Sequence, residues 1–229
     1  MSDRHERRSP GASPKAPTSA VDGYATLAAP GTAEVRVQRS RFVALAAPVA
    51  DAATARALVA EIGRRHHDAR HLCHGWRLGP EDRREEARND GGEPAGTAGE
   101  PILAAIRKAD LSDCVVAVVR YFGGIKLGTG GLARAYGDAA AAALSAGERT
   151  DVKLGHELVL RFPYARQKTV QHLLLQHAGE SRHEVYDVLV TWRIWLPRSR
   201  WRAFLVELPD ATAGEAEVLS LPGDDAPPA

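Results

Sequence analysis

Aromatic residues, cysteines and long apolar runs are all scarce in this sequence, and each scarcity excludes a class of protein. Only 6% of the 229 residues are aromatic, so the core has to be built mainly from Val, Leu, Ile and Ala. The two cysteines, Cys73 and Cys114, lie far apart and outside any paired motif, which argues against a disulfide framework and favours a reducing cytoplasm. No apolar run approaches the roughly 20 residues of a membrane span, and the first residues lack the apolar segment of a signal peptide. We therefore expect a cytoplasmic protein without membrane contact.

The overall charge is also small, and it excludes a strongly basic or strongly acidic chain. Lys and Arg number 30 against 29 Asp and Glu, which gives a formal net charge of +1. The hydrophobic fraction of 44% is ordinary for a globular protein, and the length suits one large domain or two small ones.

Composition predicts two domains between two polar tails. Residues 1–20 are rich in Ser, Pro, Gly and Arg, and 222–229 are similar, so we expect both to be disordered. An Ala-rich helical pattern ends near 146–151, and strand-like sequence resumes near 157. We place the domains at 21–150 and 151–221.

The periodicity of apolar residues predicts an α+β arrangement in both domains. In the first domain we expect strands at 34–38 and 41–45, a helix at 51–66, a strand at 71–78, a long loop at 79–100, a helix at 101–109, a buried strand at 115–122, a glycine-rich turn at 123–131 and a helix at 132–144. In the second we expect a strand at 157–162, a helix at 164–178, strands at 182–187 and 188–196, a helix at 198–208 and a strand at 215–220. This second order, βαββαβ, is the ferredoxin-like plan, with Trp192 and Ile194 on the opposite sheet face from Arg193 and Trp195.

The glycine-rich turn is the most informative motif, because it lies between a buried strand and a helix. Glycine allows positive φ and lets backbone amides converge on an anion, and a helix N-terminus adds partial positive charge. A P-loop is excluded because Lys126 is followed by Leu127 rather than Ser or Thr, and no parallel strand with a terminal acid follows to support a dinucleotide fold. The residues of this candidate phosphate cradle are Gly123, Gly124, Lys126, Gly128, Thr129, Gly130 and Gly131. The alternative is a tight turn whose glycines only permit close packing.

A second glycine-rich segment, 89–99, carries Asp90, Glu93 and Thr97. Paired carboxylates can serve acid–base chemistry, but two acids offer too few ligands for a metal, and a solvated loop is the simpler interpretation. His71, Cys73 and His74 do not form a metal site either, because alternate residues of a strand point to opposite faces. We therefore predict no metal and no cofactor.

Charge is unevenly distributed along the second domain. Basic residues outnumber acidic ones between Arg161 and Arg202, and Trp192, Trp195 and Trp201 lie in the same stretch. Such a patch is typical of a nucleic-acid face, although solvated arginines would give the same pattern.

Four segments together resemble the YigZ/IMPACT family over about 25–145, and the second domain resembles the family's bacterial C-terminal domain more weakly. The segments are Ser40-Arg-Phe42, Asp68-Ala-Arg-His-Leu-Cys73, Asn89-Asp-Gly-Gly-Glu-Pro-Ala-Gly-Thr-Ala-Gly99 and Arg120-Tyr-Phe-Gly-Gly-Ile-Lys-Leu-Gly-Thr-Gly-Gly-Leu-Ala-Arg134. Gly91 and Ala95 stand where the family normally has Asp and Ser, which weakens any role that needs those groups.

The resemblance implies both a fold and a role in translation. The first domain is expected to have the left-handed βαβ fold of a small-subunit ribosomal protein and of elongation factor G's fourth domain, and the second to be ferredoxin-like, similar to that factor's fifth domain. Eukaryotic members of the family resemble regulators of translation during amino-acid starvation, which makes RNA or the ribosome the expected partner.

The leading hypothesis is therefore a cytoplasmic, non-catalytic RNA- or ribosome-binding regulator of translation. Arg41, Arg120 and Arg134 would add backbone contacts to the cradle, Tyr121 would stack on a base, and Asp90, Glu93 and Thr97 would order the neighbouring loop. One alternative is an enzyme or sensor for a small phosphorylated ligand such as a nucleotide, with Asp90 or Glu93 as base. Another is a module that binds only protein partners.

Overall fold

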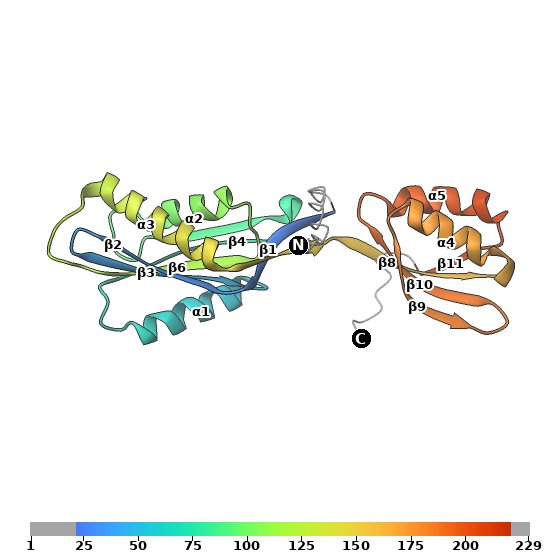
Figure 1. The fold of residues 1–229 in the computed structure, drawn as a ribbon, viewed down its shortest axis with the longest axis horizontal. Helices are drawn as coiled ribbons and strands as arrows, with labels where there is room; N and C mark the ends of the chain where they lie inside the picture. Colours follow the sequence, from blue (N-terminus) through green and yellow to red (C-terminus); the bar gives the residue numbers. More distant parts are fainter. Residues whose placement is uncertain (1–21, 221–229) are drawn as a thin grey trace, which may run out of the picture.

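The computed structural model describes residues 22–220, whose elements form two lobes, each with its own sheet and helices (Figure 1). Helices and strands both contribute throughout, which confirms the α+β class. The tails expected at 1–20 and 222–229 lie outside the described residues. In the described range, no helix is long and apolar enough to cross a membrane.

The first lobe is built on a sheet with the order β2-β3-β6-β4-β5, in which every neighbouring pair is antiparallel. Its strands, in that order, are β2 (Gly31–Val37), β3 (Ser40–Pro48), β6 (Cys114–Tyr121), β4 (His71–Leu78) and β5 (Glu85–Asn89). The central strand β6 is buried from Cys114 to Arg120, because helices cover both faces of the sheet. This explains its continuous run of β-branched residues.

Three helices complete this lobe (Figure 1): α1 (Ala52–Arg65) lies on one face of the sheet, and α2 (Gly99–Lys108) and α3 (Gly128–Ala146) lie on the other. Asp51 caps α1 by accepting the amide of Thr54 at 2.7 Å, as its position in the sequence predicts. Small residues on α3 let it approach the sheet closely, and Ala135, Ala139 and Ala140 are fully buried. Strands β3 and β4 both pair with β6, so they are parallel to each other, and α1 connects them as the βαβ unit of this lobe.

The structure corrects three expectations for this lobe. The segment 79–100, expected to be a long loop, contains β5 and a short helical turn, η1 (Glu81–Arg83). Strand β5 lies at the edge of the sheet, and its charged residues lack the apolar alternation that would predict a strand. The glycine-rich turn is shorter than expected, because Gly128 to Gly131 already form the first turn of α3. A ribbon of β1 (Gly23–Ala29) and β7 (Glu148–Lys153) was not expected at all, since β7 is almost entirely polar and exposed, although β1 adds Ala25 and Leu27 to the core.

The second lobe has the expected βαββαβ order, with the sheet order β11-β8-β10-β9. Its elements are β8 (Gly155–Phe162), a helical turn η2 (Tyr164–Arg166), α4 (Gln167–Gln176), β9 (Glu180–Tyr186), β10 (Val190–Pro197), α5 (Trp201–Thr212) and β11 (Glu217–Ser220). Trp192 and Ile194 are buried under the helices, whereas Arg193 is exposed on the opposite face, as the alternation predicts.

Candidate functional site

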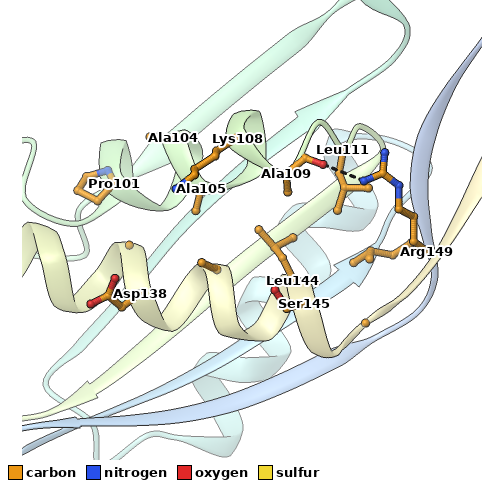
Figure 2. Close-up of a pocket in the computed structure, with 14 residues that line it drawn as sticks. Pro101, Ala104, Ala105, Lys108, Ala109, Leu111, Asp138, Leu144, Ser145 and Arg149 are labelled. Atoms are coloured by element: carbon orange, nitrogen blue, oxygen red, sulfur yellow. Dashed lines mark hydrogen bonds between the residues drawn. The ribbon is translucent and has the colours of Figure 1, made fainter. Parts of the chain in front are cut away.

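A cavity of about 640 Å³ lies between α2 and α3, with Lys108, Asp138, Ser145 and Arg149 as the polar side chains of its lining (Figure 2). Alanines, Pro101 and leucines form most of its wall. Arg149 at one end is already engaged, since its guanidinium donates to the carbonyl of Ala109 at 3.1 Å. The cavity contains none of the residues that the sequence singles out, so it is not the site that the motifs indicate.

The glycine loop between β6 and α3 is closely packed where it begins, at Gly123, and open to solvent where it ends. A Cβ on Gly123 would lie 2.0 Å from the carbonyl carbon of Arg39, so the β2–β3 turn approaches the loop too closely for any side chain there. Gly124 and Gly128 have φ values of +86° and +70°, which favour glycine. A Cβ on Gly124, Gly128 or Gly130 would meet nothing within 4 Å, so this part of the loop faces open space.

The first turn of α3 leaves its amides available. Its N-cap residue is Leu127, which has no side-chain acceptor, and the first turn carries no acidic residue. Within the part of the chain that the structure describes, no side chain caps the amides of Gly128, Thr129 and Gly130, and no backbone carbonyl outside the helix accepts from them. An N-terminus in this state is suited to an anion.

Exposed basic side chains lie on the glycine loop and on α3. Lys126 is exposed in the loop, and Arg134 is exposed in the second turn of α3. Arg39, which sequence reasoning missed, is exposed on the β2–β3 turn that packs against Gly123. None of the three is within ion-pair distance of an acid among residues 22–220. The only signal for Arg39 in the sequence was its place in a predicted hairpin turn.

Arg120 does not belong to the exposed surface, contrary to expectation. Its side chain is only 5% exposed, and its Nη1 donates to Oε1 of Glu93 at 2.7 Å. Its Nη2 donates to the hydroxyl of Ser40 at 3.4 Å, and its guanidinium lies 5.5 Å from the centre of the Phe42 ring and 5.3 Å from that of Phe122. A phosphate contact is therefore blocked, because Arg120 sits on the inner side of β6, where it ties the loop to the sheet.

Tyr121 and Arg41 are engaged with each other. The guanidinium of Arg41 lies 4.3 Å from the centre of the Tyr121 ring and 3.5 Å from a carboxylate oxygen of Glu34. The Tyr121 hydroxyl is 2.7 Å from Nδ1 of His66 and donates to Asp68 at 3.3 Å. Partial burial, and then the negative charge of Asp68, raise the pKa of this hydroxyl. The ring packs against the cluster of Ile62, Ala117 and Val119, on the α1 side of the sheet and away from α3, which argues against the expected stacking role beside the cradle.

Asp90 caps α2 from outside the helix. Its carboxylate accepts the amides of Gly96, Ala98 and Gly99 at 2.9, 3.0 and 2.8 Å. Burial by itself would raise the pKa of Asp90, but the three amides outweigh it and hold the pKa below its usual value. Helix α2 therefore has an internal anion at its N-terminus, whereas none of residues 22–220 supplies one to α3. Nearby, the Thr97 hydroxyl closes the loop by donating to the carbonyl of Pro94 at 2.7 Å.

Glu93 is the buried centre of a polar network. Its side chain is 4% exposed and accepts from Arg120 and, at 2.8 Å, from the hydroxyl of Tyr136 on α3. Nε2 of His71 lies 4.0 Å from the same carboxylate oxygen. Through Oε1 of Glu93, the network joins the 89–99 segment to β4, β6 and α3.

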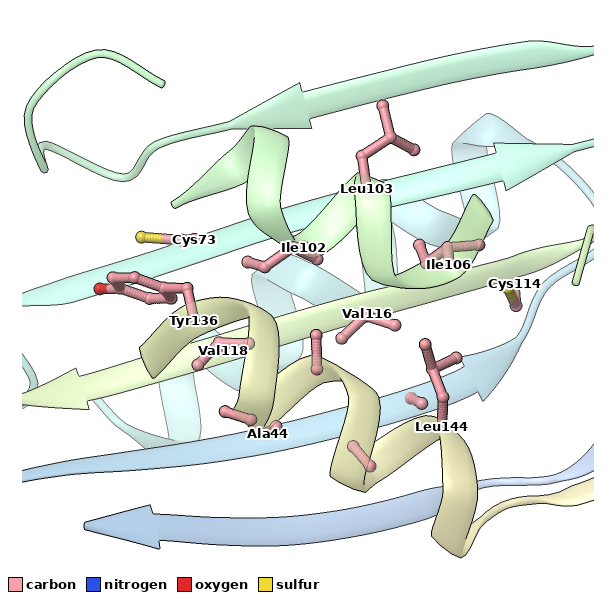
Figure 3. Close-up of a cluster of buried hydrophobic side chains, with 14 of the residues drawn as sticks. Ala44, Cys73, Ile102, Leu103, Ile106, Cys114, Val116, Val118, Tyr136 and Leu144 are labelled. Atoms are coloured by element: carbon pink, nitrogen blue, oxygen red, sulfur yellow. The ribbon is translucent and has the colours of Figure 1, made fainter. Parts of the chain in front are cut away.

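Cys73 lies beside Tyr136 at one end of the core (Figure 3) and is not set up as a nucleophile. Its thiol is fully buried and donates to the carbonyl of Asp90 at 2.9 Å. Burial raises the pKa of Cys73 to about 12, so the thiolate is rare at neutral pH. The described residues contain no group of three or more His, Cys, Asp or Glu that could hold a metal ion.

The basic excess of the second lobe is partly cancelled by the acidic end of the chain. Arg161 pairs with Glu217 at 2.7 Å, and Arg166 pairs with Glu215 at 2.8 Å. Trp192 is buried and unavailable to a ligand. The sequence excess therefore overstates the positive charge of this surface.

Comparisons with known proteins agree with these motifs. Residues 38–144 match the Impact N-terminal domain, and residues 160–215 match a domain of unknown function, DUF1949. The chain is 35% identical to the IMPACT family member YigZ of Escherichia coli (strain K12), over 88% of this chain and 99% of that protein. It is 44% identical to an IMPACT family member of Thermus thermophilus, over 70% of this chain and 86% of that one. A crystal structure described as a hypothetical protein is 33% identical, covers 89% of this chain and 99% of its own, and has a TM-score of 0.59.

Proposed function

This chain belongs to the IMPACT family, and we propose that it is a non-catalytic RNA-binding protein that regulates translation at the ribosome. The observation that carries the proposal is the first turn of α3, which opens onto free space beside the exposed Lys126; within residues 22–220 neither the turn's amides nor Lys126 has a side-chain partner. In this proposal, Gly128, Thr129 and Gly130 hold one RNA phosphate through their amides.

The attraction to RNA comes from several modest contributions that add along a strand. A helix N-terminus contributes about 0.3–1 kcal/mol toward an exposed anion. Lys126, Arg134 and Arg39 each supply a full positive charge without an internal partner within 22–220. Each phosphate that these groups neutralise releases counterions, which makes the affinity depend on salt.

The state of the two acids supports binding rather than catalysis. Asp90 accepts three backbone amides, and Glu93 accepts from Arg120 and Tyr136. A general base needs a free lone pair aimed at its substrate. Asp90 has donors on both carboxylate oxygens, and Oε1 of the buried Glu93 is held in an ion pair with Arg120. Their role in the proposal is to hold the neighbouring segment in place.

The test is RNA binding across a salt series, with a single-stranded oligonucleotide as the probe. If about four phosphates are contacted, the logarithm of the association constant falls with the logarithm of salt concentration at a slope near −3. Lys126→Ala should reduce that slope by about one unit. Lys168→Ala is the matched control, because Lys168 is an exposed lysine on α4 in the other lobe, and it should leave the slope unchanged. A flat profile, or no binding at low salt, would remove the proposal.

The partner is tested separately by co-sedimentation with ribosomes before and after nuclease treatment. The proposal expects the wild type to sediment with ribosomes and nuclease to release it, with Lys126→Ala retained less well. Co-sedimentation that survives nuclease and ignores Lys126 would point to a protein partner instead.

One alternative keeps the same site, because one helix turn of amides also suits the phosphate of a small ligand. A mononucleotide at about 100 times its dissociation constant would stabilise the protein by about 2.7 kcal/mol. Stabilisation by a mononucleotide, with no effect of oligonucleotides, would favour a small-molecule sensor over an RNA-binding protein.

A further inference from the structure

Phe122 is an exposed aromatic ring at the edge of the proposed phosphate site. It directly follows β6, and 42% of its surface is exposed. Ile125, three residues further along the same loop, is 40% exposed. Two large apolar side chains are therefore exposed on one short loop that also carries Lys126, and a ligand with both an apolar surface and a negative charge would suit this loop.

The Phe122 ring is supported from inside the protein. The guanidinium of Arg120 lies 5.3 Å from the ring centre, and Arg120 is itself held by Glu93 and Ser40. The Ser40 hydroxyl also accepts the amide of Gly123 at 3.3 Å, which fixes the backbone directly after the ring. A ring that is already held in place loses little conformational entropy when a ligand stacks on it.

The surroundings favour a nucleic acid over a peptide. Two exposed cations without an ion-pair partner in 22–220 lie near Phe122. Lys126 follows it by four residues in the same loop, and Arg39 lies on the β2–β3 turn that packs against Gly123. Strand β6 is paired with β3 as far as Tyr121, opposite Arg41, and with β4 as far as Arg120, opposite His71. It therefore offers no free edge to which a peptide could add as a strand.

Resting on the proposed function, we infer that Phe122 is the stacking platform for an unpaired base whose neighbouring phosphate binds the first turn of α3. The substrate class is therefore single-stranded RNA, or the loop of a folded RNA. A base inside a duplex is covered on both faces by its neighbours and cannot reach the ring. Phe122 takes the role that the sequence suggested for Tyr121.

The experiment measures the affinity for a fluorescently labelled single-stranded oligonucleotide and for a duplex of the same sequence. Phe122→Ala should weaken single-strand binding by about 5- to 150-fold, the range for loss of one stacked base, and should leave the salt slope unchanged because no charge is removed. Phe122→Trp should retain binding, which shows that the fold is intact. Tyr164→Ala is the matched control, since Tyr164 is a 50% exposed aromatic in the other lobe, and it should have no effect.

A second readout reports stacking directly. A 2-aminopurine base in the oligonucleotide should lose fluorescence when it binds the wild type or Phe122→Trp, and should lose less with Phe122→Ala at saturation. Single-strand affinity within twofold of wild type in Phe122→Ala, or equal affinity for the duplex, would overturn the inference and leave the proposed function standing. Absence of salt-dependent RNA binding by the wild type would instead remove the proposed function, and this inference with it. Ribosome binding that resists nuclease but is lost in Phe122→Ala would assign the ring to a protein partner and overturn the inference.

Discussion

Removing the Glu93 carboxylate should be among the most destabilising single changes in the first lobe. The Arg120 side chain is only 5% exposed, and Glu93→Ala removes the carboxylate that neutralises its charge. The substitution also removes the acceptor of the Tyr136 hydroxyl. Breaking a buried ion pair from one side typically costs about 3–5 kcal/mol, because a charge stays buried without compensation. We expect a loss of that size in the free energy of unfolding, measured by urea denaturation.

Two comparisons separate the buried pair from general damage. Glu34→Ala removes an exposed glutamate that also pairs with two arginines, Arg36 at 2.9 Å and Arg41 at 3.5 Å, and should cost less than about 1 kcal/mol. The double variant Glu93→Ala/Arg120→Met removes both charges, so it should be clearly more stable than the sum of the two single variants predicts. A loss below about 1 kcal/mol in Glu93→Ala, or simple additivity in the double variant, would refute the assigned role of this network.

Three further predictions follow from the same geometry. Gly130→Ala should raise the free energy of unfolding by about 0.5–1 kcal/mol in thermal denaturation, because helical Gly130 has open space around it. The same substitution should weaken RNA binding, because the added methyl group fills the site. An increase in both stability and RNA affinity would contradict this site. The lowered pKa of Asp90 means that its stabilisation is present above the unfolded value of about 3.9 and is lost as pH falls through the folded pKa. Urea titrations from pH 3 to 7 should therefore show the stability gap between wild type and Asp90→Asn closing at the acidic end, and a gap independent of pH would speak against the three-amide cap. Cys73 and Cys114 are buried with pKa values raised to about 12, so a thiol reagent at pH 8 should label neither until the protein is unfolded.

Much of the fold follows from patterns in the sequence, and the comparisons confirm the family resemblance. The β-branched run at 115–122 predicts a central strand, and the structure places β6 at the middle of the sheet. The βαββαβ order of the second lobe is also confirmed. These elements are readable because burial on one or both faces imposes a strict apolar pattern.

The elements that were missed lack such a pattern. Strand β5 is an exposed edge strand, and its partner β4 stabilises it through backbone pairing that leaves no mark on side-chain polarity. The first turn of α3 reads as a loop because three of its four residues are glycine, which has low helix propensity.

For the candidate site, sequence reasoning found the segments but not the exposure of individual side chains. Neighbours along a strand point in opposite directions, so Arg120 turns inward to Glu93 while Tyr121 turns toward His66 and Asp68. Which of these residues stays available depends on partners far away in the chain. The sequence alone could not show this.

Amide chemical shifts give the most direct test of an anion site at the start of α3. In ¹⁵N-labelled wild type titrated with a single-stranded oligoribonucleotide, the signals of Gly128, Thr129 and Gly130 should shift together with one dissociation constant, and Lys126→Ala should weaken that constant. If the signals of those three amides do not move while RNA is bound, and signals of the second lobe shift instead, the first turn of α3 is not the RNA site.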